Sequence, residues 1–197
     1  MNKLMGFLEL NDMSLPSIPW KQYTGHEELS KDFLWTIRSA VYRGDDLNLP
    51  RSIGKNASDS KKFADQLILD MKDNGMVIYY PYFIANKSGT LEVRMDSVII
   101  EAVKKDLWNL VTYSDREVTI IADIYGNSKK IVGNDTFLSE YEQNELYKHV
   151  PEIRKLFRDE LFQGKSILLE WSFAQSCDTN ENPVGDEYLV FYEARTI

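Results

Sequence analysis

Residues 165–174 read KSILLEWSFA and residues 187–196 read EYLVFYEART, and these two stretches decide the fold. Both are rich in aliphatic and aromatic residues and alternate over part of their length, which predicts two β-strands. The stretch between them, residues 175–186, is polar and contains Asn, Pro and Gly, so it predicts a loop. The end of the chain is therefore expected to form two strands joined by a polar loop.

Side chains alternate between the two faces of a strand. In the second strand this alternation places Phe191, Glu193 and Arg195 on one face and Tyr192 on the other. If the two strands pair as neighbours, Glu170 and Glu193 share a face with Arg195 nearby. Two carboxylates suit Mg²⁺, and a guanidinium binds phosphate oxygens, so the three residues predict a metal–phosphate site. The alternative is a solvated sheet face with a cross-strand ion pair.

The remaining elements give an α+β chain with a largely antiparallel sheet and two principal helical regions. The first helix is expected over residues 58–72, with Ser58 and Asp59 as caps. The second region begins at Ser139, whose spacing to Glu142 predicts a capping box, and Pro151 interrupts it. Further strands are expected at residues 76–84, 90–93, 97–103 and 118–124, with a turn at residues 86–89.

Composition restricts the class of protein. The chain has 197 residues, which predicts a single domain over residues 1–197. Its net charge of −8, with scattered basic residues, disfavours nucleic-acid binding. No apolar run predicts a membrane span, and the single cysteine, Cys177, provides no disulfide framework, so we expect a cytoplasmic protein. His26 and His149 stand in no metal-ligand spacing and are expected at the surface or at a helix end.

The closing strands also carry a resemblance to a known family. Leu169-Glu170-Trp171, followed by Phe191-Tyr192-Glu193-Ala194-Arg195-Thr196-Ile197, resembles the end of the ATP-grasp domain of phosphoenolpyruvate synthase and pyruvate phosphate dikinase. The resemblance implies that Glu170 and Glu193 ligate Mg²⁺ and that Arg195 contacts phosphate. The family has Gln where this chain has Glu193, which keeps an oxygen ligand but adds a negative charge.

A second match lies upstream. Residues 34–40 (LWTIRSA), followed by residues 44–47 (GDDL), resemble the family segment whose arginine binds the nucleotide phosphates. The resemblance implies this role for Arg38, and a strand-end surface arginine is the alternative. Residues 49–55 (LPRSIGK) are similar only in part to the family's flexible phosphate-covering stretch.

Two weaker matches complete the nucleotide site that the resemblance implies. Residues 76–89 look like the family's hinge strand beside adenine, which makes Tyr79 and Tyr80 candidates, with ordinary packing as the alternative. The opening residues are similar to the family's first strand, where a lysine meets ATP. This similarity makes Lys3 a candidate, although the glycines that precede the family's lysine are absent.

Together these matches predict a compact ATP-grasp-like domain that binds ATP and Mg²⁺ and acts as a phosphotransferase component on an unknown acceptor. The family's phosphohistidine and pyruvate-binding domains are missing from this chain, so a partner protein would supply the phosphohistidine or the substrate. The alternative is a catalytically inactive ATP-grasp-like module that contacts a partner protein.

Overall fold

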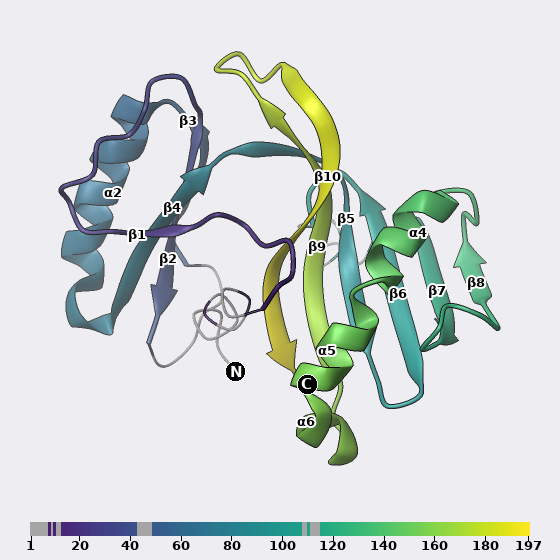
Figure 1. Ribbon diagram of the computed structural model, residues 1–197. Helices are drawn as coiled ribbons and strands as arrows, with labels where there is room; N and C mark the ends of the chain where they lie inside the picture. Colours follow the sequence, from purple (N-terminus) through teal and green to yellow (C-terminus); the bar gives the residue numbers. More distant parts are fainter. Residues whose placement is uncertain (1–7, 9, 11–12, 43–48, 108–109, 111–114) are drawn as a thin grey trace. The chain divides into compact units, whose positions relative to one another are not determined.

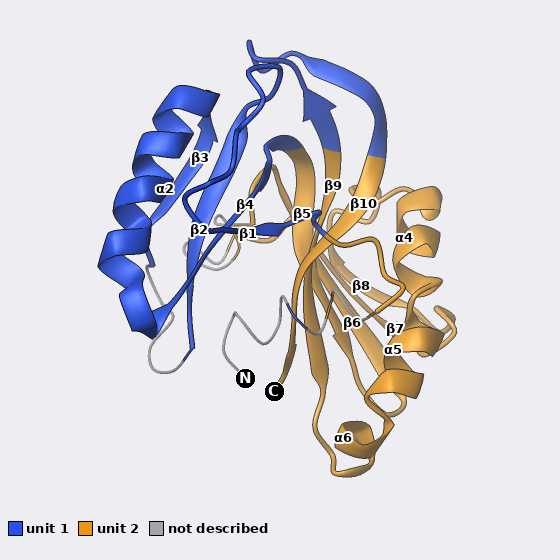
Figure 2. Cartoon of the chain, turned by 60° about the vertical axis from the view of Figure 1, so that its left-hand side comes forward, with its two compact units in different colours: residues 1–8, 18–84, 175–187 blue, residues 9–17, 85–174, 188–197 orange. Residues whose placement is uncertain are grey.

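The computed structural model describes residues 8, 10, 13–42, 49–107, 110 and 115–197 (Figure 1). The chain divides into two compact units, coloured separately in Figure 2. Unit 1 comprises residues 1–8, 18–84 and 175–187, and unit 2 comprises residues 9–17, 85–174 and 188–197. The single-domain organisation stays a prediction.

Unit 1 contains a four-stranded antiparallel sheet in the order β1-β4-β2-β3. Its strands are β1 (Lys21–Tyr23), β2 (Trp35–Val41), β3 (Arg51–Lys55) and β4 (Gly75–Pro81). Helix α2 (Ala57–Met71) packs along one face of this sheet (Figure 1), and the 3-10 turn η1 (Lys72–Asn74) leads from it into β4. The core under the helix is made of aromatic and aliphatic side chains from β1, β2, β4 and α2: Tyr23, Trp35, Ile37, Ala64, Leu67, Met71 and Val77.

Helix α2 confirms the prediction over residues 58–72, displaced by one residue at each end. The predicted caps were wrong. Asn56 is the N-cap, and its side-chain oxygen accepts a hydrogen bond from the backbone N–H of Asp59 at 2.9 Å. Asn at this position satisfies a backbone donor that the first helical turn leaves without a partner.

Unit 2 contains the six-stranded sheet, in the order β10-β9-β5-β6-β7-β8. Its strands are β5 (Phe83–Val93), β6 (Ser97–Lys104), β7 (Val118–Asp123), β8 (Lys130–Gly133), β9 (Ile167–Cys177) and β10 (Pro183–Thr196), of which β5, β9 and β10 also carry residues of unit 1. Helices α4 (Glu140–Tyr147), α5 (Val150–Leu156) and α6 (Arg158–Phe162) lie on one face of it (Figure 1). Their apolar side chains close the core with those of the sheet: Leu91, Ile100, Ile120, Leu146, Ile153, Phe157, Leu169, Trp171 and Phe173.

The predicted helical region from Ser139 is confirmed, including its capping box. A side chain from the sheet strengthens this box, because Lys87 Nζ donates to Glu142 Oε2 at 2.8 Å and to the carbonyl oxygen of Phe137 at 2.8 Å. Pro151 separates the region into α4 and α5, as predicted, because proline fits only the first turn of a helix. Helix α6 follows as a third short helix.

Two predicted loops were wrong. The expected turn at residues 86–89 lies inside β5, which runs unbroken from Phe83 to Val93. The expected loop at residues 175–186 is shorter, because β9 continues to Cys177 and β10 begins at Pro183. In both places polar residues and glycine belong to paired strands, since neighbouring strands satisfy the backbone groups that solvent would satisfy in a loop.

The predicted fold class is confirmed: the structure is α+β, with antiparallel sheets and two principal helical regions. Within the described residues, no helix has the length and apolar character needed to cross a membrane.

Replacing Gly89 by alanine is expected to destabilise the protein by about 1–3 kcal/mol. An added Cβ would lie 1.9 Å from the carbonyl oxygen of Glu101 and 2.5 Å from Cζ2 of Trp171, so backbone and ring would both have to move. Glycine-to-alanine changes within strands otherwise favour folding. Urea-induced unfolding measures the difference. The exposed Ser176→Ala variant is the control, and equal stability of the two variants would contradict the steric explanation.

Candidate functional site

The six-stranded sheet has one apolar face, covered by helices, and one face that carries both polar and apolar side chains. The helices cover the face that carries Leu169 and Trp171, so alternation places Glu170 and Ser172 of β9 on the helix-free face. The same alternation holds for the neighbouring strand β5, whose Leu91 lies in the core beneath the helices. The helix-free face therefore collects hydroxyl and carboxylate side chains from adjacent strands.

The predicted alternation of β10 is wrong at Phe191 and Tyr192, each of which lies on the opposite face to the one predicted. Phe191 and Ala194 both belong to the core beneath the helices, and the ring of Phe191 contacts that of His149 edge to face at 5.5 Å. The hydroxyl of Tyr192 instead shares a short hydrogen bond with Ser172 on the helix-free face. Tyr192 and Glu193 therefore lie consecutively on the same face, as in a β-bulge, which re-aims side chains in this way.

Glu170, Glu193 and Arg195 form one group on this face, which we term the carboxylate–arginine cluster. Arg195 Nη2 donates to Glu170 Oε1 at 2.6 Å, and Arg195 Nε lies 3.4 Å from Glu193 Oε1. The Glu193 side chain is 3% exposed and that of Glu170 is 14% exposed, whereas Arg195 is 33% exposed. One partly accessible guanidinium thus holds two carboxylates that are almost removed from water.

The cluster adjoins a row of buried hydroxyl groups. Ser88 of β5 and Ser172 of β9 are fully buried, and their Oγ atoms are 2.5 Å apart. Tyr192 continues the row from β10. Each hydroxyl group forms a hydrogen bond with the next one in the row. Such pairing is the condition for burying polar groups in a sheet. Sequence reasoning missed this row because only pairing of β5 beside β9 brings Ser88 to Ser172.

The sequence-predicted residues of unit 1 lie on two different faces of its sheet. Tyr79 lies on the α2 side, where its ring contacts those of Trp35 at 5.6 Å and Tyr23 at 5.9 Å. Alternation along β2 and β4 places Arg38 and Tyr80 on the helix-free face. The surroundings of Tyr79 are those of a packing residue, which was the stated alternative for the tyrosine-rich strand.

Two other sequence-based expectations concern the N-terminal half. Lys3 lies outside the described residues. Residues 51–55, expected within a phosphate-covering loop, form strand β3 and pair with β2, which corrects that part of the prediction. Gly54 has a φ of +64°, and an added Cβ there would meet the ring of Tyr82 at 3.5 Å.

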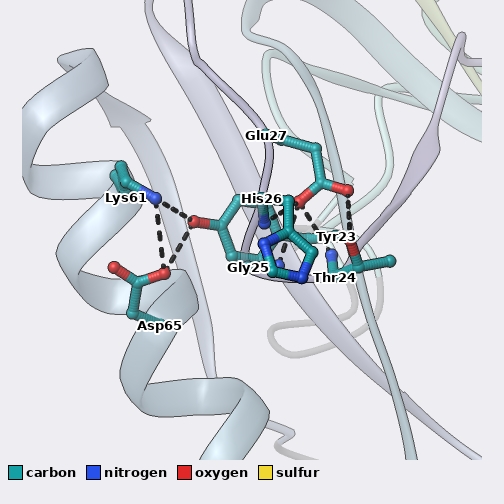
Figure 3. Close-up of polar contacts among 7 residues, drawn as sticks. All are labelled: Tyr23, Thr24, Gly25, His26, Glu27, Lys61 and Asp65. Atoms are coloured by element: carbon teal, nitrogen blue, oxygen red, sulfur yellow. Dashed lines mark hydrogen bonds and ion pairs between the residues drawn. The ribbon is translucent and has the colours of Figure 1, made fainter.

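Figure 3 shows the polar contacts that anchor β1 and the turn after it in unit 1. The Tyr23 hydroxyl donates to Asp65 Oδ1 at 2.7 Å and accepts from Lys61 Nζ at 3.0 Å, which ties β1 to helix α2. The two charged residues also pair at 3.6 Å. Burial raises the pKa of Tyr23, so the phenol keeps the proton that it donates.

The second part of Figure 3 is a turn organised by Glu27. Its carboxylate accepts hydrogen bonds from the hydroxyl and backbone N–H of Thr24 and from the backbone N–H groups of Gly25 and His26. Burial alone would raise the pKa of Glu27, but the Thr24 and backbone hydrogen bonds outweigh burial and lower it to about 2. This arrangement is structural and lies outside the sequence-predicted site.

His149 was expected at the surface or at a helix end, and it lies at a helix end. It is the N-cap residue of α5, half-buried against Phe191. Its Nε2 atom has no hydrogen-bond partner within the described residues. Burial lowers the pKa of His149, and the charge of Lys148 lowers it further. His149 is therefore a neutral packing residue at neutral pH.

Among the described residues, no group of three or more His, Cys, Asp or Glu side chains could enclose a metal by itself. Mg²⁺ is commonly held by one or two carboxylates, with phosphate oxygens and water completing its octahedron. Glu170 and Glu193 match this smaller requirement, because both contact the same guanidinium from adjacent strands.

The comparison with solved structures identifies the fold. The dinucleotide-forming acetyl-coenzyme A synthetase 1 of Ca. Korarchaeum cryptofilum, in complex with coenzyme A, Ca-AMPCP and HgCl⁺, matches with a TM-score of 0.58 and 9% sequence identity. The alignment covers 100% of this chain and 92% of that one. The fold is ATP-grasp-like. At this identity the similarity concerns the ATP-grasp-like fold alone.

A second similar structure is the macrocyclase MdnC from Microcystis aeruginosa MRC, bound with the precursor peptide MdnA. It has a TM-score of 0.49 and 9% identity, and the alignment covers 98% of this chain and 51% of that one. No protein-family model matches the sequence, and neither does any curated protein.

Replacing Arg195 by methionine is expected to lower the free energy of unfolding by about 1–3 kcal/mol, because it removes the guanidinium that contacts the buried Glu193 carboxylate. The Arg195→Met, Glu193→Gln double variant is expected to recover about half of that loss. Urea denaturation of the wild type, the two single variants and the double variant forms a complete cycle. Additive effects of the two substitutions would contradict the coupling.

Replacing Glu27 by glutamine is expected to lower stability by about 1 kcal/mol at pH 6, a value reduced for solvent screening of this partly exposed group. The folded-state pKa is depressed from 4.5 to about 2, so the contribution is present above pH 4.5 and disappears as the pH falls towards 2. Denaturation at pH 6 and pH 3 checks this, with Glu28→Gln as the neighbouring control. A constant difference between Glu27→Gln and wild type at both pH values would refute the assignment.

Proposed function

We propose that this chain binds ATP together with Mg²⁺ and acts as a phosphotransferase component. The observation that carries the proposal is the carboxylate–arginine cluster, in which Glu170 and Glu193 meet at one guanidinium on the helix-free face of a sheet. The ATP-grasp-like fold supports it, since the similar acetyl-coenzyme A synthetase was solved with Ca-AMPCP. The resemblance to the phosphoenolpyruvate synthase and pyruvate phosphate dikinase family assigns the same three residues to nucleotide binding.

The ligand-free geometry indicates how the cluster would work. Without a metal, Arg195 neutralises part of the charge of the two carboxylates. With Mg²⁺ bound, Glu170 and Glu193 would turn their oxygens to the ion, and the guanidinium would be released to grip phosphate oxygens. The ion would supply charge neutralisation for phosphoryl transfer, and the side chains would supply positioning.

Glu193 distinguishes this cluster from the family that it resembles, which has Gln at that position. A second carboxylate makes the site more negative. Without Mg²⁺ the site therefore repels the phosphates of ATP more strongly, and with Mg²⁺ it attracts the cation more strongly. We therefore propose that Glu193 makes ATP binding depend more steeply on Mg²⁺ than a glutamine would.

The proposed nucleotide contacts of unit 1 are Arg38 for phosphate and Tyr80 for the base. Both lie on the helix-free face of the four-stranded sheet, whereas Tyr79 packs beneath α2. Lys3 remains a proposed ATP contact through the family resemblance alone. The phosphoryl acceptor is proposed to be a partner protein that supplies a phosphohistidine or a substrate domain.

A second function is favoured by one observation. The residues expected to cover the phosphates, 51–55, form strand β3 instead of a flexible loop. This arrangement would suit a catalytically inactive module that keeps the ATP-grasp-like fold and contacts a partner protein. Release of ADP or phosphate in the presence of ATP, Mg²⁺ and the acceptor protein separates the two functions, since only the phosphotransferase turns over nucleotide.

Calorimetric titration with ATP is expected to show binding that requires Mg²⁺ and that Glu170→Gln and Glu193→Gln each weaken at least about 10-fold, a difference of about 1.4 kcal/mol. Arg38→Ala is expected to weaken binding with and without the metal, because it acts on phosphate. The exposed Asp186→Asn variant of β10 is the control. No binding at millimolar ATP, or equal binding by all variants, would overturn the proposed site.

A further inference from the structure

The row of hydroxyl groups beside the carboxylate–arginine cluster runs from the interior of the protein towards its surface. Ser88 Oγ lies 2.5 Å from Ser172 Oγ, and Ser172 Oγ shares a hydrogen bond with the Tyr192 hydroxyl. Both serines are fully buried, whereas Tyr192 is half-buried. Of the three residues, the tyrosine is therefore the one that a ligand can reach.

Burial decides the direction in which the row donates its hydrogen bonds. Each hydroxyl group has one proton, and the two contacts of the row use two of the three protons. In the described part of the chain, Ser88 Oγ has no hydrogen-bond partner other than Ser172. If Tyr192 donated to Ser172 and Ser172 to Ser88, the third proton would be buried on Ser88 without an acceptor. An unsatisfied buried donor is costly, so Ser88 donates to Ser172 and Ser172 donates to Tyr192.

This direction determines what the Tyr192 hydroxyl can do. Its oxygen accepts from Ser172, so its own proton is donated outside the row, on the helix-free face. Hydrogen bonds in a chain polarise one another, so a phenol that accepts one hydrogen bond is a stronger donor in the next. The two buried serines thus orient Tyr192 as a hydrogen-bond donor.

The Tyr192 hydroxyl lies close to the carboxylate–arginine cluster. Glu193 follows Tyr192 directly in β10, and Ser172 lies two residues from Glu170 on the same face of β9. Two residues of a strand span about 7 Å. A ligand whose phosphates meet Mg²⁺ and Arg195 at the cluster can therefore also meet the phenol.

We propose that Tyr192 donates a hydrogen bond to a phosphate oxygen of the bound nucleotide, and that Ser172 is a positioning residue that acts through Tyr192. This inference rests on the proposed function and adds a donor that the family resemblance does not assign. An outward proton suits an anionic oxygen, since Mg²⁺ would need a lone pair on that side. Hydrogen bonds to such charged acceptors are stronger than those between neutral groups.

Calorimetric titration with ATP and Mg²⁺ tests the phenol. Tyr192→Phe removes the hydroxyl and keeps the ring, and it is expected to weaken binding at least about 10-fold, as for the loss of a hydrogen bond to a charged group. Tyr188→Phe, 40% exposed on the same strand, is the matched control and is expected to bind like the wild type. Inorganic triphosphate with Mg²⁺ is expected to lose the same factor. A loss with ATP but not with triphosphate would place the contact on the nucleoside and refute the inference.

A double-mutant cycle tests the positioning role of Ser172. Ser172→Ala is expected to weaken ATP binding at least about 3-fold in the wild-type background and to have no further effect beside Tyr192→Phe, because it acts through the phenol. Thermal unfolding confirms that each variant is folded. Additive effects would contradict the positioning role.

The same titrations separate this inference from the proposed function. Equal ATP binding by Tyr192→Phe and the wild type would overturn the inference and leave the proposed function standing. Absence of ATP binding by the wild type would overturn both.

Discussion

The close approach of Trp171 to Gly89 is the constraint on which the six-stranded sheet depends. An alanine Cβ at Gly89 would lie 2.5 Å from Cζ2 of the Trp171 indole, so glycine is needed for the ring to approach β5 this closely. This contact holds β9 beside β5 at one register. The same register puts Ser88 against Ser172 on the opposite face and so decides where Glu170 lies. Packing on the helix-covered face of the sheet thus fixes the positions of Ser172 and Glu170 on the other face.

The carboxylate–arginine cluster is an arrangement that electrostatics alone would not favour in an acidic chain. Burying Glu193 costs desolvation energy, and a second carboxylate beside it adds repulsion. Arg195 offsets both effects because it contacts Glu170 and Glu193 together. Tyr192 and Glu193 both have contacts on the helix-free face, so the regular alternation of side chains along β10 is interrupted there.

Local patterns predicted much of the fold. The amphipathic spacing of α2, the capping box at Ser139 and the interruption at Pro151 are confirmed, because each depends on residues within a few positions of one another. Predictions failed where a distant partner decides the outcome. Residues 86–89 look like a turn, yet β6 and β9 pair with them and make them part of a strand. Likewise Phe191, which was predicted on the face of Glu193, packs in the core beneath the helices and contacts His149.

The sequence by itself determined the fold class and the helices, because alternation and helix capping act over short distances along the chain. It predicted the grouping of Glu170, Glu193 and Arg195 only on the condition that the two closing strands are neighbours, which the sheet order supplies. Tertiary structure alone decided the Ser88–Ser172–Tyr192 row and the packing of Tyr79 beneath α2. These features require knowing which strands are neighbours. Strand order depends on the burial of whole sheet faces, and no local pattern encodes it.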